Sequence, residues 1–335
     1  MNSDKSITHV ILTGGVGSRL WPLSRKSRPK QYLEIFEGKS LFEMTVERNS
    51  HLANKVMVVG NVDNHQLSGK VMEKTSTSYI NIIEATPRNT AAAIAFAAFA
   101  SEPDDILIIT PSDHIIDQME NYNQAISEAV QKANDGFIVT FGVIPTKPET
   151  GYGYIEAEGD NVISFREKPN ETTAKEFIAK GNFLWNSGMF CFKASVLLEE
   201  LKKFQPDVFE KSKAVWEASK EGFLDLALSM EIPSISIDYA VMERSKKIKV
   251  VPASFSWSDL GSFESVYDYL NSKGHCTDSN GNMVIGCDKH TTFLGLKNTI
   301  FVYTETANLI LQKENSQDVK DIYSELEKQN SDLLN

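Results

Sequence analysis

The sequence is poor in cysteine and in basic residues. Its three cysteines, Cys191, Cys276 and Cys287, lack the C-x-x-C spacing of a zinc or redox motif. They therefore predict reduced thiols rather than a disulfide framework. Lys and Arg number 34 against 45 Asp and Glu, which gives a net charge of −11. This balance argues against general nucleic-acid binding, which usually needs a basic face.

Long apolar runs are missing as well. The longest covers residues 91–100, far too short to cross a bilayer, and the polar N-terminus has no signal-peptide core. We therefore expect a cytoplasmic protein with no membrane partner. A hydrophobic content of 41% is ordinary for a globular protein, and the length suggests two domains or one large domain with an appendage.

Against this acidic background, residues 6–32 contain no Asp or Glu. A short apolar run at residues 10–12 predicts a strand that leads into this region. Three glycines and several cations follow, among them Gly14, Gly15, Gly17, Arg19 and Lys30. Glycine lets backbone N–H groups approach phosphate oxygens, and Arg and Lys neutralise phosphate charge. The stretch predicts a phosphate site, with a plain strand-to-loop turn as the alternative.

Two common phosphate-binding motifs are excluded here. Residues 38–40, Gly-Lys-Ser, match the second half of a Walker A loop, but Leu33 stands where its first glycine belongs. A dinucleotide-binding fingerprint needs a third glycine at the position of Leu20. Any phosphate site in this region therefore follows a different pattern.

Apolar periodicity predicts alternating strands and helices, which favours a Rossmann-like, mostly parallel α/β sheet flanked by helices. We expect strands over residues 56–60, 81–84, 106–109, 137–143, 163–169 and 189–192, and helices over 40–52, 91–100, 118–134, 172–180, 195–205 and 207–221. Four short apolar segments at 283–286, 292–296, 299–302 and 309–311 predict a small all-β unit, followed by a helix capped by Ser316. We place the domain boundary after residue 270.

Two aspartates are candidate metal ligands. Asp113 follows the apolar run at 106–109, at the carboxyl end of a strand, where open α/β sheets bind ligands. Mg²⁺ prefers oxygen ligands and usually shares them with phosphate. Since one carboxylate would leave the ion held mainly by water and phosphate, we expect a second carboxylate ligand, and the family resemblance described below implies that it is Asp259. The alternative for Asp113 is a cap on the following helix.

Two sets of polar residues are candidates for contacts with a base and with a sugar. Arg88, Asn89 and Thr90 precede the alanine-rich run, where they could frame a purine base or simply start a helix.

The sugar candidates come from three further segments. The backbone of Gly151 and Gly153 could approach sugar hydroxyls, although a hairpin turn explains these glycines equally. Glu167 and Lys168 could meet the hydroxyls and the phosphate, or form an ordinary surface pair. Asn186 can both donate and accept hydrogen bonds, which suits a sugar, but it also suits a turn.

Seven motifs in order carry a family resemblance. Residues 12–31, LTGGVGSRLWPLSRKSRPKQ, resemble the signature of the sugar-phosphate nucleotidylyltransferases, and Leu-Trp-Pro-Leu-Ser-Arg is similar to the branch that acts on mannose 1-phosphate. The other motifs lie at residues 88–93, 111–114, 167–169, 185–190, 236–243 and 257–262. Ala92 stands where the family pattern usually has proline.

The resemblance implies a catalytic domain over residues 1–270 and a short β-helix-like appendage with a C-terminal helix over 271–335. It implies transfer of GMP from GTP to α-D-mannose 1-phosphate, which gives GDP-mannose and pyrophosphate by in-line attack on the α-phosphorus. The loop glycines and residues 88–90 would bind the nucleotide, and the three sugar segments would bind the sugar phosphate. Arg19 and Lys30 would act as catalytic cations beside Mg²⁺.

Other interpretations stay open at this point. The chain could use another hexose 1-phosphate or base, or it could be a GDP-mannose-binding regulator without activity. A dinucleotide dehydrogenase is disfavoured by the missing third glycine. A longer form of the family carries a fused isomerase domain that this sequence does not reach, so we expect no isomerase activity. The appendage and terminal helix would suit a homodimer.

Overall fold

The computed structural model describes residues 6–34 and 38–335, so most of the N-terminal stretch used in the signal-peptide argument lies outside it. By their contacts, the residues divide into two units. The first comprises residues up to Gly14, 46–112 and 116–257, and the second comprises 15–45, 113–115 and 258–335. This division differs from the boundary placed after residue 270, and the separate roles of 1–270 and 271–335 stay a prediction.

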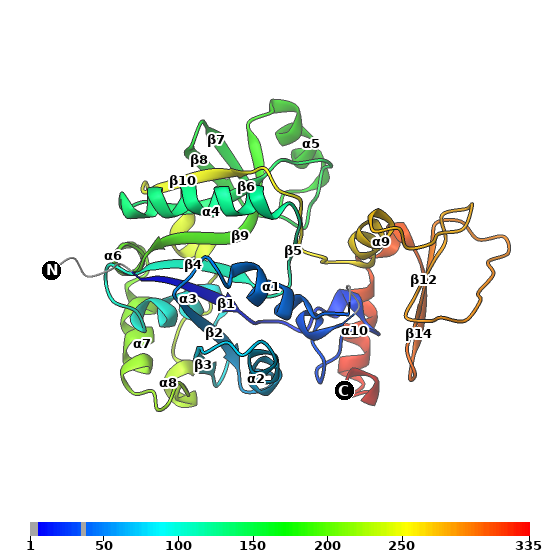
Figure 1. The fold of residues 1–335 in the computed structure, drawn as a ribbon, viewed down its shortest axis with the longest axis horizontal. Helices are drawn as coiled ribbons and strands as arrows, with labels where there is room; N and C mark the ends of the chain where they lie inside the picture. The colour runs from blue at the N-terminus through cyan, green and yellow to red at the C-terminus, as the bar shows by residue number, and fades with distance from the viewer. Residues whose placement is uncertain (1–5, 35–37) are drawn as a thin grey trace. The chain divides into compact units, whose positions relative to one another are not determined.

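The first unit is built on a nine-stranded sheet with the order β3-β2-β1-β4-β9-β6-β10-β8-β7 (Figure 1). Its strands are β1 (Ile7–Leu12), β2 (Lys55–Asn61), β3 (Ile80–Glu84), β4 (Ile106–Pro111), β6 (Ile138–Val143), β7 (Tyr154–Glu158), β8 (Asn161–Arg166), β9 (Phe183–Lys193) and β10 (Ile248–Ala253). Every antiparallel pairing involves β8 or β9, so all the other strands run in one direction. The prediction of a mostly parallel sheet flanked by helices is confirmed.

Helices cover both faces of this sheet. They are α2 (His65–Lys74), α3 (Asn89–Phe99), α4 (Met119–Asn134), α5 (Glu171–Lys180), α6 (Ala194–Phe204), α7 (Pro206–Glu217), α8 (Leu226–Met230) and the π-helical turn η3 (Asp238–Met242). Because side chains alternate along a strand, Leu107 and Ile109 of β4 face the core that contains α3, α6 and α7. Ile106 and Ile108 face the core that contains α4. Both faces of β4 are therefore buried, as its unbroken apolar run predicts.

The second unit has its own core, formed by helices and a three-stranded sheet. Its elements are η1 (Ser18–Leu20), η2 (Lys30–Tyr32), α9 (Phe263–Ser272), β12 (Met283–Ile285), β13 (Thr299–Tyr303), β14 (Asn308–Gln312), η4 (Lys313–Asn315), α10 (Val319–Lys328) and η5 (Asp332–Leu334). The chain passes between the units within α1 (Leu41–Asn49) and beside the two-residue strands β5 (Ile115–Ile116) and β11 (Trp257–Ser258). In the three-stranded sheet, β13 is the central strand; it pairs with β12 in parallel and with β14 in antiparallel orientation.

Two local predictions in this unit are wrong. Residues 292–296 form no strand; they lie in an irregular segment where Leu294 is 94% exposed. An apolar pattern makes a strand only where a neighbouring strand can pair with it, and β13 and β14 pair with each other instead. Ser316 does not cap the last helix: Asp318 is its N-cap residue, and the Ser316 hydroxyl donates to the carbonyl of Lys313.

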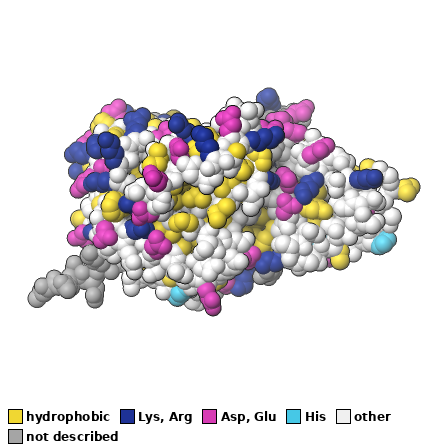
Figure 2. Space-filling model, turned by 90° about the horizontal axis from the view of Figure 1, so that it is seen from above, with side chains coloured by type: hydrophobic (Ala, Val, Ile, Leu, Met, Phe, Trp, Pro, Cys, Tyr) yellow, Lys and Arg dark blue, Asp and Glu magenta, His cyan; other side chains and the backbone are white. Residues whose placement is uncertain are grey.

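The surface carries charges of both signs. On the face shown in Figure 2, Lys and Arg side chains are interspersed with Asp and Glu side chains. In the part of the chain that the structure describes, no helix is both long enough and apolar enough to cross a membrane.

Candidate active site

The glycine-rich turn follows β1 and contains two positions that require glycine. Gly15 and Gly17 have φ of 79° and 78°, in the left-handed region that other residues avoid. A Cβ atom on Gly17 would also lie 2.6 Å from Lys30 Cβ, because the lysine side chain packs against this glycine. Gly14 has neither constraint, since its Cβ position meets no described atom within 4 Å.

Alanine substitutions at these glycines should therefore have graded effects. We expect Gly14→Ala to change the free energy of unfolding by less than about 0.5 kcal/mol, and Gly15→Ala to lower it by about 1 kcal/mol through backbone strain. Gly17→Ala adds a collision with Lys30 and should lower it by about 2–4 kcal/mol. Urea unfolding of the three variants measures the series; equal losses at all three positions would contradict it.

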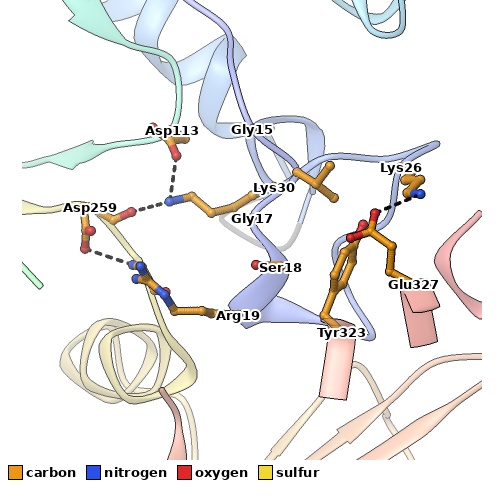
Figure 3. A pocket seen from close by; sticks show the side chains of 12 residues that line it. Gly15, Gly17, Ser18, Arg19, Lys26, Lys30, Asp113, Asp259, Tyr323 and Glu327 are labelled. Atoms are coloured by element: carbon orange, nitrogen blue, oxygen red, sulfur yellow. Dashed lines mark hydrogen bonds and ion pairs between the residues drawn. The ribbon is translucent and has the colours of Figure 1, made fainter. Parts of the chain in front are cut away.

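Lys30 joins two acidic segments of the second unit (Figure 3). Its ammonium nitrogen lies 2.8 Å from Asp113 Oδ2 and also donates to the backbone carbonyl of Asp259. Arg19 Nη1 donates to the carbonyl of Gly261 at 3.2 Å, so both cations bind the same turn. The result is a cavity of about 490 Å³ whose lining includes Gly15, Gly17, Arg19, Lys30, Asp113 and Asp259.

The turn around Asp259 positions its carboxylate. Asp259 Oδ1 accepts a hydrogen bond from Gly261 N at 2.9 Å, and Leu260 between them has a φ of 46°. A Cβ atom on Gly261 would lie only 2.6 Å from Asp259 Oδ2. Glycine at this position therefore leaves room for the carboxylate, while Ser262 caps α9 directly afterwards.

Lys30 also keeps Asp113 ionised. Burial alone would raise the pKa of the Asp113 carboxyl, but the charges of Lys30 and His114 outweigh burial and hold that pKa below its usual range. The Lys30 side chain is only 6% exposed, so its ammonium group needs an anionic partner of this kind. Asp113 is therefore an anion at neutral pH, which is the form that binds a metal ion.

In the first unit, a cluster of four residues includes Asn186 on β9. The Asn186 backbone N–H donates to Gly153 O at 2.8 Å, and its Nδ2 donates to Asp238 Oδ1 at 2.8 Å. A Cβ atom on Gly153 would lie 2.8 Å from Glu167 Oε2, so Glu167 lies against this glycine. The structure thus brings together Gly153, Glu167 and Asn186 and adds Asp238, which was not among the predicted site residues.

Asp238 should make stability depend on pH. Burial and the charge of Glu167 raise the pKa of its carboxyl from 3.8 to about 6, against an opposing hydrogen bond from Asn186. The pKa of this carboxyl is higher in the folded than in the unfolded protein, so folding favours the protonated form. The contribution of protonated Asp238 to the free energy of unfolding is therefore complete below pH 3.8 and is lost as the pH rises through 6. The side chain in Asp238→Asn is neutral at every pH. The free energy of unfolding of this variant, relative to that of wild type, should therefore be about 2 kcal/mol higher at pH 7.5 than at pH 4. Urea unfolding at both pH values checks this; a difference independent of pH would contradict it.

Two other predicted sugar residues are engaged within their own loops. Gly151 N donates to Glu149 Oε1 at 2.9 Å, so this amide already has a partner. Lys168 is exposed, and its Nζ lies 3.3 Å from Glu167 Oε1. Exposed pairs of this kind contribute little to stability, which leaves Lys168 able to exchange partners at small cost. Their roles in sugar binding stay predictions.

Residues 88–90 begin α3 and are tied to the segment before η3. Arg88 Nε donates to Ile232 O at 2.7 Å, and Ile237 N donates to Thr90 Oγ1 at 2.9 Å. Asn89 is exposed and has a φ of 70°. Arg88 and Thr90 therefore have the structural role that the sequence allowed as the alternative, and nucleotide binding by the three residues stays a prediction.

Six residues that line the cavity were not among the predicted site residues: Val16, Ser18, Lys26, Gly261, Tyr323 and Glu327. Tyr323 and Glu327 lie on α10, near the opposite end of the chain from Lys26. Helical spacing predicts that helix, but nothing in it indicates which segment the helix packs against.

A mostly parallel sheet flanked by helices, with a glycine turn directly after β1, is an α/β fold, and the proteins that this chain resembles have the same class of fold. The chain belongs to the nucleotidyl transferase family, whose profile matches residues 8–274. It is 39% identical to the alginate biosynthesis protein AlgA of Pseudomonas aeruginosa, over 96% of this chain and 72% of that protein. It is 38% identical to a mannose-1-phosphate guanylyltransferase of Escherichia coli, over 93% and 72%. The structure of a mannose-1-phosphate geranyltransferase from Thermus thermophilus matches with a TM-score of 0.84 and 29% identity, over 96% of this chain and 99% of that one.

Proposed function

We propose that this chain transfers GMP from GTP to α-D-mannose 1-phosphate and releases GDP-mannose and pyrophosphate. The observation that carries the proposal is the position of Lys30, which contacts both acidic segments in one cavity beside the glycine turn. The assignment of guanine as the base and mannose as the sugar rests on the guanylyltransferase relative named above. A cytoplasmic location and a homodimer stay predictions.

The reaction needs no protein nucleophile. An oxygen of the sugar phosphate attacks the α-phosphorus of GTP, the bond to the β-phosphate oxygen breaks, and pyrophosphate leaves in line. Positioning and charge neutralisation supply most of the catalysis in transfers of this type. Arg19 donates one N–H to Gly261 O, and its remaining N–H groups can bind phosphate oxygens. Lys30 is already held in place before substrate binds, so little reorganisation is needed.

The acidic residues fit a divalent cation that is shared with phosphate. Among residues 6–34 and 38–335, no group of three or more His, Cys, Asp or Glu side chains could enclose a metal ion by itself. Two carboxylates beside a phosphate cavity suit Mg²⁺, which is usually bound by one or two carboxylates together with substrate phosphates. We propose that Asp113 and Asp259 hold it. When bound, Mg²⁺ would supply charge stabilisation at the reacting phosphates.

In the first unit, the residues around Asn186 are proposed to bind the mannose moiety. Asn186 directs one amide N–H at Asp238 and keeps another, and the Glu167 carboxylate can accept hydrogen bonds from hydroxyl groups. The ammonium group of Lys168 would break its ion pair with Glu167 and bind the phosphate group of the sugar instead.

A panel of substrates tests this function. Pyrophosphate release is measured with each of the four nucleoside triphosphates combined with mannose, glucose, galactose and N-acetylglucosamine 1-phosphates. The proposal expects the highest kcat/KM for GTP with mannose 1-phosphate. A clear preference for another pair would mean that the chain is a nucleotidyl transferase with a different substrate specificity. No pyrophosphate release with any pair would favour a binding protein without activity.

A further inference from the structure

Helix α10 contributes directly to the phosphate cavity of the second unit. Tyr323 and Glu327, one turn apart on this helix, line the cavity together with Lys26 from the acid-free stretch. In Figure 3 these three side chains lie on one side of Gly17 and Ser18, and Asp113 and Asp259 lie on the other side. The cavity therefore extends from the two aspartates across the glycine turn to α10.

The end of the chain also anchors the loop that carries Lys26. Trp21 Nε1 donates to Leu333 O at 3.1 Å, and the Lys26 backbone N–H donates to Leu334 O at 2.8 Å. These bonds hold the Trp21 side chain and the Lys26 backbone, on either side of residues 22–25, against the C-terminal segment. The C-terminal segment thus sets the position of Lys26. Helix α10, which precedes this segment, forms part of the cavity wall.

Tyr323 presents an unused donor. Its side chain is buried, with 6% exposure, and its hydroxyl has no hydrogen-bond partner among the residues that the structure describes. Buried hydroxyls are nearly always paired, so an unpaired hydroxyl on a residue that lines a cavity points to a ligand. Burial raises the pKa of this hydroxyl, with Lys26 opposing and Glu327 adding to the shift, so it is protonated at neutral pH.

Lys26 has a partner that it can exchange. Its Nζ lies 3.1 Å from Glu327 Oε1, and the two side chains are 49% and 56% exposed. Such exposed pairs are weak, whereas the bond from an ammonium group to a phosphate oxygen is charge-assisted. A phosphate group in the cavity can therefore replace Glu327 as the partner of Lys26.

We propose that α10 completes a subsite for the terminal phosphates of a nucleoside triphosphate, in which Tyr323 donates to a phosphate oxygen and Lys26 exchanges Glu327 for the same group. This rests on the proposed function. If the α-phosphorus reacts beside Asp113 and Asp259, the β- and γ-phosphates extend over the glycine turn toward α10. The subsite then also holds the departing pyrophosphate.

Isothermal titration with inorganic pyrophosphate, and separately with GTP, tests the subsite in the absence of mannose 1-phosphate. Tyr323→Phe should weaken pyrophosphate binding about tenfold, because it removes one hydrogen bond to a charged group. Glu327→Gln should strengthen binding about threefold, because it removes a carboxylate that competes for Lys26. In turnover, Tyr323→Phe should raise the KM for GTP and leave the KM for mannose 1-phosphate unchanged.

Two matched variants serve as controls. Tyr269→Phe removes a hydroxyl from a buried tyrosine of α9, and Glu325→Gln removes a charge from α10; neither residue is among those lining the cavity, and both variants should bind as wild type does. Wild-type affinity in Tyr323→Phe would overturn the subsite, as would unchanged or weaker binding in Glu327→Gln. Glu327→Gln changes an exposed side chain, so it still tests the subsite if Tyr323→Phe does not fold. Failure of the wild type to bind GTP or pyrophosphate would instead overturn the proposed function.

Discussion

Asp113→Asn is expected to lower kcat for nucleotidyl transfer by about 10³-fold while the protein remains folded. Asparagine keeps the size of the side chain, and its carbonyl oxygen can still accept a hydrogen bond from Lys30, which lies 2.8 Å from Asp113 Oδ2. What disappears is the negative charge that a hard divalent cation requires. The Lys30 side chain is only 6% exposed and loses its anionic partner, so the free energy of unfolding should fall by about 3 kcal/mol.

The measurement is mannose 1-phosphate-dependent pyrophosphate release at saturating substrates, with thermal denaturation as the check on folding. Asp288→Asn is the matched control, because Asp288 is exposed in the same unit and is not among the residues lining the cavity. It should retain wild-type turnover. Turnover of folded Asp113→Asn within tenfold of wild type would remove Asp113 from the proposed metal site.

Lys30→Met is expected to reduce kcat/KM for GTP by about 10²- to 10³-fold. Methionine retains an unbranched side chain that can pack against Gly17, so the shape of the turn is largely kept. The substitution removes the ammonium group that joins the Asp113 carboxylate to the Asp259 backbone. It also leaves Asp113 without this cation, so the pKa of Asp113 should rise toward its usual range.

Arg28→Met is the control for Lys30→Met. Arg28 lies in the same acid-free stretch, but its side chain is 53% exposed and its Nη2 pairs with Glu34 at 3.6 Å. Both variants lose one positive charge, so only the position of the charge distinguishes them. Initial-rate kinetics with varied GTP should show near wild-type values for Arg28→Met. Equal losses in the two variants would mean that overall charge, and not the buried ammonium group, supports the reaction.

The sequence predicts the parts of the fold that depend on local patterns. The apolar run at residues 10–12 becomes the end of β1, and the glycine-rich stretch that follows it forms a turn in which Gly15 and Gly17 have positive φ. Ser40 caps α1 by accepting a hydrogen bond from Glu43 N, three residues further on, at 3.1 Å. Turn and cap chemistry involves residues a few positions apart, so a single sequence contains the whole signal.

Features that depend on distant contacts were not predictable in this way. Strand β9 lies between β4 and β6 in the sheet although it follows both in sequence, and no residue in it specifies that place. Asn186 and Asp238 meet only because β9 and η3 are brought together by the fold. Lys26 and Tyr323 line one cavity from opposite ends of the chain. Patterns of hydrophobicity predict that such elements exist but not which surfaces they share.

Phosphorus NMR of the wild-type protein with GTP, mannose 1-phosphate and Mg²⁺ tests the central claim most directly. The account predicts that signals of GDP-mannose and pyrophosphate grow in equal amounts, that omission of either substrate or of the metal ion abolishes both, and that Asp113→Asn shows neither on the same time scale. Release of inorganic phosphate, or loss of GTP signal without mannose 1-phosphate, would contradict it.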